Sequence, residues 1–227
     1  MTISLNGIGV ERTEAIDAEI RDLVIAGWTS RDREALEAHI AELERLGVAR
    51  PKRVPTFYRV AASLLTTAAE IQVLGGDSSG EAEPVVLRLG DRTWLGVGSD
   101  HTDRALERQG VALAKQLCTK PIGRDLWSLD DVLDHWDRLT LRSFAVDGAR
   151  REPYQEGTLA SMRTPDELVR LYAGGDELGP GTAMFCGTLA VRGEIRPAES
   201  FEIELEDPVL RRTLRHAYRV RDLPVEE

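Results

Sequence analysis

The chain has 227 residues, of which 42% are hydrophobic and 30% charged, and its formal net charge is −10. These values are typical of a single globular core, and the acidity argues against the basic surface that binds nucleic acid or anionic membranes. Cys118 and Cys186 lie far apart without disulfide-framework or metal-ligand spacing, and neither a signal peptide nor a transmembrane run is visible. We therefore expect a cytoplasmic protein without nucleic-acid or membrane partners.

The first part of the chain, residues 1–50, is predicted to be a small strand and helix segment packed on a core formed by residues 51–227. Residues 22–28 form an apolar run that predicts a buried strand. Apolar residues three and four positions apart predict a helix over residues 31–46. A turn-rich stretch with prolines at positions 51 and 55 places the boundary near residue 50.

The predicted helix carries His39 and Glu42, which lie one turn apart and are therefore neighbours on its surface. One interpretation is a solvated pair on the polar face of the helix. The other is a general-base dyad, in which the carboxylate orients the imidazole and raises its basicity. The residues themselves leave both interpretations open.

Three acids follow in the middle of the chain. After predicted strands at residues 56–60 and 70–74, Glu81 and Glu83 alternate at the head of an apolar run, so both carboxylates leave the same face of a strand. A turn at residues 90–92 predicts a hairpin that brings Asp100 close to them. Hard oxygen ligands of this kind suit Mg²⁺ or Mn²⁺, although solvent-facing alternation on an edge strand is the competing interpretation.

Residues 103–117 are predicted to be helical, with an interruption at Gly110 that also allows a short helix, a bend and a strand. Leu106, Val111, Leu113 and Leu117 are predicted to point inward. Lys115 and Thr119 end the segment near the acids. Lysine otherwise occurs only at positions 52 and 120, so a chemical role for Lys115 competes with that of an ordinary surface lysine.

The remaining elements alternate helix and strand signals. The expected elements are a helix from residue 128 to 136, a strand from 139 to 146, a helix from 164 to 172, a segment from 182 to 189, and a strand from 201 to 207 followed by a helix or strand through 219. The glutamates at positions 202, 204 and 206 are assigned to solvent, because no other polar group accompanies them.

Taken together, these motifs resemble the fumarylacetoacetate hydrolase superfamily, and more narrowly its bacterial DUF2848 branch. The matching segments, in family order, are His39-Ile40-Ala41-Glu42, Pro55-Thr56-Phe57-Tyr58, Glu81-Ala82-Glu83, Asp100-His101-Thr102-Asp103-Arg104, Lys115 with Thr119, and Gly187-Thr188. The resemblance covers about residues 20 to 207. Two positions depart from the family pattern: Ser99 stands where the family has Asn, and Pro197-Ala198-Glu199 replaces Pro-Gly-Asp.

The resemblance implies an α+β fold, a mixed β-roll or barrel of the fumarylacetoacetate hydrolase C-terminal type with a few peripheral helices, usually as a homodimer. It implies Mg²⁺ or Mn²⁺ held by Glu81, Glu83 and Asp100, and a small-molecule 2-oxo or β-dicarbonyl acid as substrate. The implied catalytic residues are His39, Glu42 and Lys115, and the implied substrate-binding residues are Phe57, Tyr58, Arg104, Thr119 and Thr188.

The implied reaction is hydrolytic cleavage of a C–C bond through an enolate. Decarboxylation of an oxaloacetate-type acid, keto–enol isomerisation and hydration are alternatives, because the family carries out all of these reactions on one fold. A metal phosphoesterase is a competing class, but two-metal sites need more ligands than this cluster offers. A non-catalytic metal-binding protein is the other competitor, and such a protein has no need of the His39 and Glu42 pair.

Overall fold

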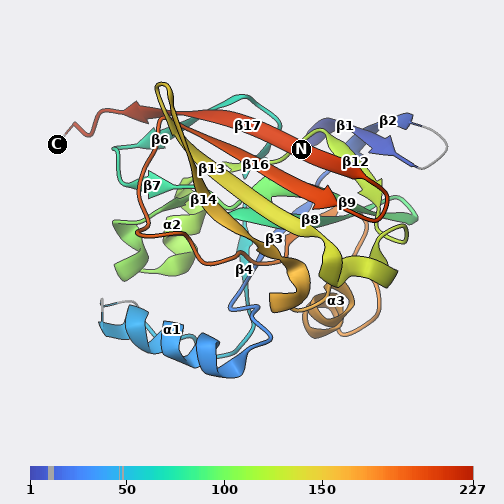
Figure 1. The fold of residues 1–227 in the computed structure, drawn as a ribbon, viewed down its shortest axis with the longest axis horizontal. Coiled ribbons are helices and arrows are strands. Elements are labelled where there is room, and N and C mark those ends of the chain that lie inside the picture. Colours follow the sequence, from blue (N-terminus) through green and yellow to red (C-terminus); the bar gives the residue numbers. More distant parts are fainter. Residues whose placement is uncertain (10–12, 46, 48, 227) are drawn as a thin grey trace.

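A computed structural model describes residues 1–9, 13–45, 47 and 49–226 of the chain. Within this part, the larger of two main sheets has eight strands (Figure 1). Their spatial order is β2 (Thr13–Glu19), β1 (Thr2–Ile8), β12 (Asp125–Ser128), β9 (Arg92–Ser99), β8 (Ala82–Leu89), β15 (Thr182–Phe185), β3 (Asp22–Gly27) and β4 (Thr56–Val60). The sheet is mixed, since β1 pairs in parallel with β12 and β15 with β3, while its other pairs are antiparallel.

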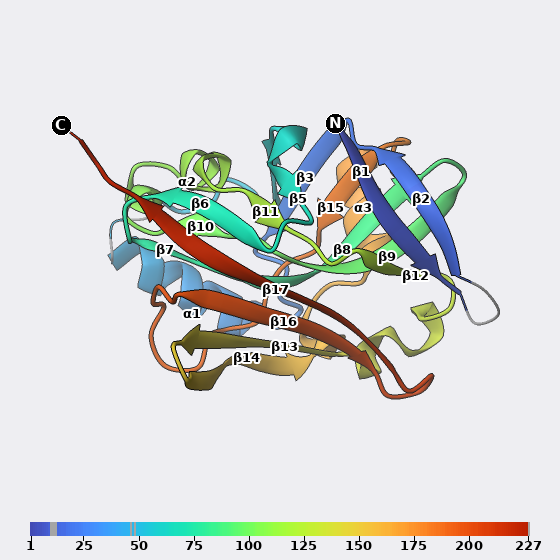
Figure 2. The same ribbon diagram turned by 90° about the horizontal axis from the view of Figure 1, so that it is seen from above.

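The second main sheet has five strands and forms a separate layer when the molecule is seen from above (Figure 2). Their order is β14 (Arg150–Thr158), β13 (Thr140–Asp147), β16 (Ser200–Asp207), β17 (Arg212–Leu223) and β6 (Glu70–Leu74). Two short pairs complete the strands: β10 (Thr102–Asp103) with β7 (Ser78–Ser79), and β11 (Lys120–Pro121) with β5 (Leu65–Thr66).

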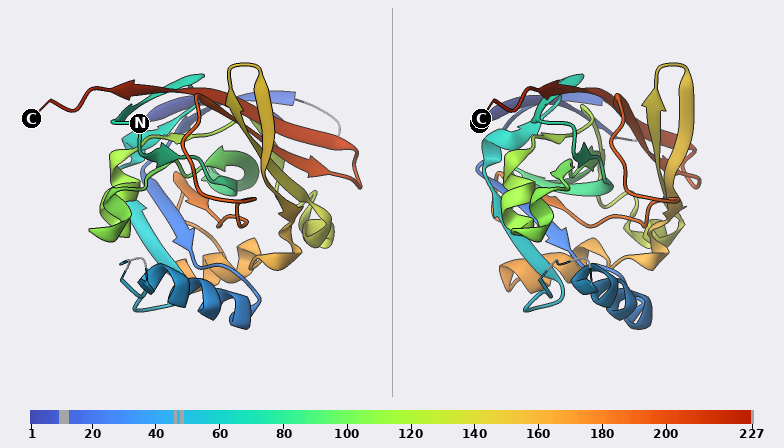
Figure 3. Two further views of the ribbon diagram at one scale, coloured as in Figure 1. Left: turned by 60° about the vertical axis from the view of Figure 1, so that its left-hand side comes forward. Right: turned by 90° about the vertical axis from the view of Figure 1, so that its left-hand side faces the viewer.

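The α-helices of the described part are few and lie at the periphery (Figures 1 and 3). They are α1 (Arg33–Arg45), α2 (Val111–Leu117) and α3 (Pro165–Ala173), with short 3₁₀ helices at Ala62–Leu64, Leu106–Arg108, Leu133–Arg138 and Leu159–Ser161. Helix α3 is capped by Thr164, whose hydroxyl accepts a hydrogen bond from the Glu167 amide at 3.4 Å. None of these helices has the length and apolar character needed to cross a membrane.

The eight-stranded sheet curls around an apolar interior. Val85 and Leu87 of β8 belong to a buried cluster to which every strand of this sheet contributes. Val86, between them, points the other way, into a cluster shared with β13, β16 and β17. Because both faces of the sheet are covered, β8 and β9 are continuous apolar runs rather than alternating ones. Val85 and Leu87 point to the inner face of the curled sheet. Residues 81 and 83 are in the same alternation and therefore point to that face too.

Most sequence predictions of secondary structure are confirmed. Helix α1, the strands β3, β4, β6, β13 and β16, the β8–β9 hairpin and helix α3 lie where expected, and the segment after residue 208 is the strand β17. Cys118 and Cys186 are buried and form no disulfide. The predicted helix at residues 128–136 is a 3₁₀ helix at Leu133–Arg138 that follows β12. The boundary at residue 50 stays a prediction; β1 to β3 on its near side pair with strands of the same sheet as β8 and β9.

The inward face predicted for residues 103–117 is wrong for two of its four leucine and valine positions, while Leu106 and Val111 are half-buried. Leu113 and Leu117 are 52% and 40% exposed, whereas Ala114 and Lys115 of α2 are buried. The break at Gly110 is real, and only the seven residues after it form an α-helix. The helix is turned so that the Lys115 ammonium reaches buried carboxylates, and this electrostatic constraint overrides the apolar pattern.

The close approach of strands at Gly98 of β9 gives the first testable prediction. A Cβ added there lies 2.7 Å from the Phe185 ring and 2.8 Å from Val85 Cγ2. We expect Gly98→Ala to lower the free energy of unfolding by about 1–3 kcal/mol, because the packed interior has no room for a methyl group. Gly175→Ala is the matched control, since a Cβ added at that glycine has no neighbouring atom within 4 Å. Equal unfolding midpoints for the two variants in urea contradict this prediction.

Candidate metal centre

The β8–β9 hairpin brings the three predicted acids together at one end of the curled sheet. Glu83 lies opposite Gly98 in the antiparallel register, and the Asp100 amide donates to the Glu81 carbonyl at 2.9 Å, just beyond the last strand pair. Alternation along both strands directs the three side chains to the inner face. One carboxylate oxygen from each residue lies within 4.8 Å of the others. The convergence predicted from the sequence is therefore present in the structure.

Asp100 is completely buried between two lysines. The ammonium of Lys115, from α2, contacts its Oδ2, and the ammonium of Lys120, from β11, lies 2.9 Å from its Oδ1. Burial alone raises the pKa of this carboxyl, but the two positive charges outweigh burial and hold the pKa well below its usual range. In turn, the carboxylates around Lys115 outweigh the effect of burial and raise its pKa. Both groups are therefore ionised at neutral pH.

Glu83 has the opposite environment. It is 2% exposed, and its Oε2 accepts a hydrogen bond from the Gly187 amide at 2.7 Å. Among the described residues, no basic side chain forms an ion pair with it. Burial and the negative charge of Asp100 raise the pKa of Glu83 well above its usual range. A buried carboxylate that lacks a counter-ion is electrostatically suited to receive a cation.

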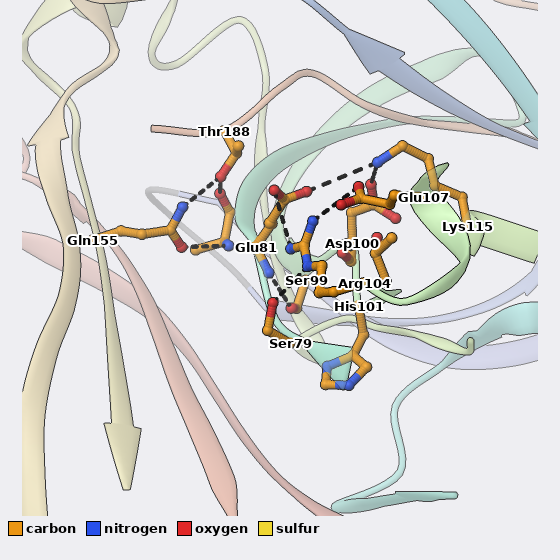
Figure 4. A network of polar contacts seen from close by, with 12 residues as sticks. Ser79, Glu81, Ser99, Asp100, His101, Arg104, Glu107, Lys115, Gln155 and Thr188 are labelled. Carbon is orange, nitrogen blue, oxygen red and sulfur yellow. Dashed lines mark hydrogen bonds and ion pairs between the residues drawn. The ribbon is translucent and has the colours of Figure 1, made fainter. Parts of the chain in front are cut away.

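Glu81 is the most accessible of the three acids, and Arg104 holds it in place (Figure 4). Arg104 Nη2 lies 3.1 Å and Lys115 Nζ 3.8 Å from the Glu81 carboxylate. The other guanidinium nitrogens of Arg104 contact Glu107 at 3.0 Å and the Ser79 hydroxyl at 2.7 Å. The sequence predicts Arg104 as a substrate-binding residue; in this structure all its nitrogens face groups of the chain itself.

The residues present fit a divalent metal ion. All three donors are carboxylate oxygens, the ligand type that Mg²⁺ and Mn²⁺ prefer. Glu83 forms no ion pair within the described part of the chain, and this is the structural sign that a cation belongs here. Glu81, Glu83 and Asp100 would hold the ion, and Lys115 lies beside them.

The structure does not bring all the predicted substrate-binding residues to the same place. Lys115 Nζ lies 5.8 Å from the centre of the Tyr58 ring, and the Thr119 hydroxyl is buried without a hydrogen-bond partner in the described part of the chain. Phe57 points to the opposite face of β4 and packs against Tyr172. The Thr188 hydroxyl donates to the Ala82 carbonyl at 2.8 Å, between the two glutamates.

The proposed proton-transfer residues, His39 and Glu42, have their backbone in α1, but their side chains lie outside the described residues. The segment before this helix lies close to Glu83, because it packs against Gly187, whose amide binds that carboxylate. Thr29 is buried against Gly187. A Cβ added at Gly187 would lie only 1.8 Å from the Thr29 hydroxyl oxygen. The Trp28 indole donates to the Tyr58 hydroxyl at 3.3 Å. The dyad stays a prediction.

Sequence reasoning missed several residues that surround the carboxylates. The sequence does contain a sign that Lys120 matters, because it is one of only three lysines in the chain. Glu107 belongs to no motif, and the sequence gives no sign of its place beside Arg104. Gln155 and Tyr218 come from the second sheet, far away in sequence, and only the tertiary structure reveals them.

The fold is that of fumarylacetoacetate hydrolase family proteins. A putative member from Yersinia pestis CO92 superposes with a TM-score of 0.62 at 17% identity, covering 91% of this chain and 95% of that one. The yeast family protein ynq8 gives a TM-score of 0.63 at 15% identity, with 91% and 95% covered. A 2-keto-3-deoxy-D-arabinonate dehydratase complexed with magnesium and 2,5-dioxopentanoate gives 0.64 at 15% identity, with 95% and 78% covered.

Among the proteins with this fold, the sequence identifies the family to which this chain belongs. The model of the family described as "Protein of unknown function (DUF2848)" matches residues 26–218, so the chain belongs to the DUF2848 family. No curated protein matches the sequence. The family and the α+β fold predicted from the motifs are thus confirmed.

The contrast between Glu83 and Asp100 gives the second prediction. Because the folded-state pKa of Glu83 is raised, its contribution to stability is present at acid pH and is lost as pH rises through that pKa. We therefore expect Glu83→Gln to stabilise the metal-free protein at neutral pH by at least about 1 kcal/mol. Asp100 is the reverse case: its stabilisation is present above the unfolded-state value of 3.8 and is lost as pH falls.

Asp100→Asn is thus the matched comparison, and we expect it to destabilise the protein by about 3–5 kcal/mol, because two buried lysines lose their partner. Chemical denaturation of both variants in the presence of a chelator measures the two effects. Shifts of the same sign contradict the electrostatic assignment.

Proposed function

We propose that this protein is a divalent-metal-dependent enzyme that cleaves a C–C bond in a 2-oxo or β-dicarbonyl carboxylic acid. The observation that carries the proposal is the buried carboxylate of Glu83, which has no counter-ion in the described part of the chain and lies within reach of Glu81 and Asp100. When bound there, Mg²⁺ or Mn²⁺ supplies a Lewis acid that polarises the carbonyl oxygens of the substrate.

The charges around the site favour an anionic substrate. The cluster contains four carboxylates, Glu81, Glu83, Asp100 and Glu107, and three basic groups, Arg104, Lys115 and Lys120. With all of them ionised, one net negative charge remains. A divalent cation converts this to one positive charge, which the carboxylate of an acid substrate neutralises. The dehydratase with a similar fold, whose structure holds magnesium and 2,5-dioxopentanoate, supports the same substrate class.

Individual residues then have separate roles. Lys115, kept protonated by its carboxylate neighbours, balances negative charge that develops on the substrate oxygen. Thr119 offers a hydroxyl that has no partner in the described structure. His39, oriented by Glu42, removes a proton from water or from the substrate; the segment that precedes α1 lies against Gly187, whose amide binds Glu83.

A general base at His39 favours hydrolysis over decarboxylation, because hydrolysis must activate water and decarboxylation need not. A decarboxylase, isomerase or hydratase on the same residues is the alternative, and product analysis separates them. We further propose a homodimer, which light scattering in solution tests.

The third prediction concerns activity. With Mg²⁺ or Mn²⁺, a screen of acylpyruvates, oxaloacetate and ring-cleavage 2-oxo acids is expected to find a substrate whose turnover a chelator abolishes. Lys115→Met is expected to lower kcat by at least about 100-fold. Lys52→Met, at an exposed lysine outside the site, leaves kcat unchanged.

His39→Asn tests the base. We expect a loss of about 10²–10⁴-fold in kcat for hydrolysis. Undiminished turnover of every accepted substrate excludes the dyad, and release of CO₂ as the sole cleavage product identifies a decarboxylase instead.

The fourth prediction is a pH dependence of metal binding. The metal competes with the proton that the raised pKa of Glu83 retains, so affinity for Mn²⁺ falls as pH decreases through that pKa. Calorimetric titrations in buffers of different ionisation enthalpy measure the protons released on binding. An affinity that stays constant between about pH 5 and pH 8 contradicts the role of Glu83.

A further inference from the structure

The two strands that carry the metal ligands present a second face to the rest of the molecule. Glu81, Glu83 and Asp100 point into the curled sheet, whereas the residues between and beside them, such as Ala82 and Ser99, point toward the five-stranded sheet. Strands β13, β16 and β17 of that sheet pack against β8 and β9. The second sheet therefore lies directly behind the ligands without supplying one.

Gln155, on β14, reaches from this sheet to the peptide between the two glutamates (Figure 4). Its side chain is completely buried, and its Oε1 accepts hydrogen bonds from the Ala82 amide at 2.9 Å and from the Ser143 hydroxyl at 2.8 Å. Its Nε2 donates to Thr188 Oγ1 and to the Leu189 carbonyl, each at 2.7 Å. All four bonding positions of the amide are thus used.

Thr188 completes this arrangement by donating to the Ala82 carbonyl. The Ala82 N–H is therefore hydrogen-bonded to Gln155 and its C=O to Thr188, and these two side chains are hydrogen-bonded to each other. Since Ala82 lies between Glu81 and Glu83, fixing its backbone fixes the directions in which both carboxylates leave the strand.

Tyr218, on β17, is hydrogen-bonded to the two neighbours of Asp100 in the chain. Its hydroxyl is hydrogen-bonded to Ser99 Oγ at 2.7 Å and to His101 Nδ1 at 3.1 Å, so it contacts the residues on both sides of Asp100. Ser99 Oγ also accepts a hydrogen bond from the Glu81 amide at 3.1 Å. In Figure 4 the His101 ring points away from Lys115, toward the side opposite the carboxylates.

We propose that the five-stranded sheet positions the three metal ligands through two buried side chains, Gln155 and Tyr218. The proposal rests on the metal site of the proposed function and adds its supporting residues. A site that keeps three carboxyl groups within 4.8 Å of one another, ready to bind an ion, needs a rigid frame. Gln155 holds the Glu81 and Glu83 pair, and Tyr218 links Asp100 to Glu81.

Tyr218→Phe is the decisive variant, because the chain offers a matched control in Tyr154→Phe. Both tyrosines are buried in the same aromatic cluster, with ring centroids 5.9 and 5.6 Å from that of Phe201. The Tyr154 hydroxyl accepts a hydrogen bond from the Arg196 amide at 3.2 Å, a contact that does not reach the ligands. Each substitution removes one buried hydroxyl, and only one of these hydroxyls contacts the residues that flank a ligand.

The measurement is the dissociation constant for Mn²⁺, obtained by isothermal titration calorimetry on the full chain. We expect Tyr218→Phe to weaken binding about tenfold or more, as is typical for residues that orient metal ligands, and Tyr154→Phe to leave it unchanged. Gln155→Met is expected to weaken binding at least as much. Thermal unfolding of each variant reports the general loss of stability, which both tyrosine variants share.

Ser99→Ala removes the same hydrogen bond between Ser99 and Tyr218 from its other end. It therefore tests the proposal if Tyr218→Phe does not fold. It is expected to weaken Mn²⁺ binding to a similar extent. A double variant, Tyr218→Phe with Ser99→Ala, is expected to weaken binding by less than the product of the two single effects, because the two residues share one hydrogen bond.

The outcomes separate this inference from the proposed function. A parent protein that binds no Mn²⁺ overturns both. A parent that binds Mn²⁺ while Tyr218→Phe and Ser99→Ala bind it equally well overturns only the positioning role. Equal losses in Tyr154→Phe and Tyr218→Phe also overturn it, because they indicate general loosening of the cluster.

Discussion

The ion pairs around Asp100 hold together parts of the chain that are otherwise separate. Asp100 directly follows β9, Lys115 comes from α2, and Lys120 comes from β11, where its ammonium also donates to the His101 carbonyl at 2.5 Å. An unpaired charge at such a buried position is strongly unfavourable, so the three groups must stay together. This requirement explains why α2 turns a lysine inward and leaves Leu113 exposed to solvent.

The same site contains a group that the fold does not neutralise. Glu83 is as deeply buried as Asp100, yet its described partner is a single backbone amide. Residues that break the usual rules of burial are expected where function requires them, because the cost to stability is compensated elsewhere in the structure. Here the compensation is the extensive apolar interior of the curled sheet and the covering of its outer face by the second sheet.

The fold alone does not select a reaction. The structures with similar folds include proteins named only by family and a dehydratase, at 15 to 17% identity to this chain. Around the carboxylates this chain places a second buried lysine, Lys120, and Glu107 beside Arg104. Chemistry in such scaffolds is decided by side chains at the end of the sheet, while the sheet provides their spacing.

The sequence by itself predicted most of the elements and the three acids of the candidate metal centre. The alternation of Glu81 and Glu83, the turn after β8 and the position of Asp100 are local patterns, and a hairpin converts them into one cluster by geometry alone. Tertiary structure decided what lies around that cluster. Lys120, Gln155 and Tyr218 meet the carboxylates through strand pairings and sheet packing that no local pattern encodes, and the direction in which α2 faces follows from burial of charge rather than from the spacing of its leucines.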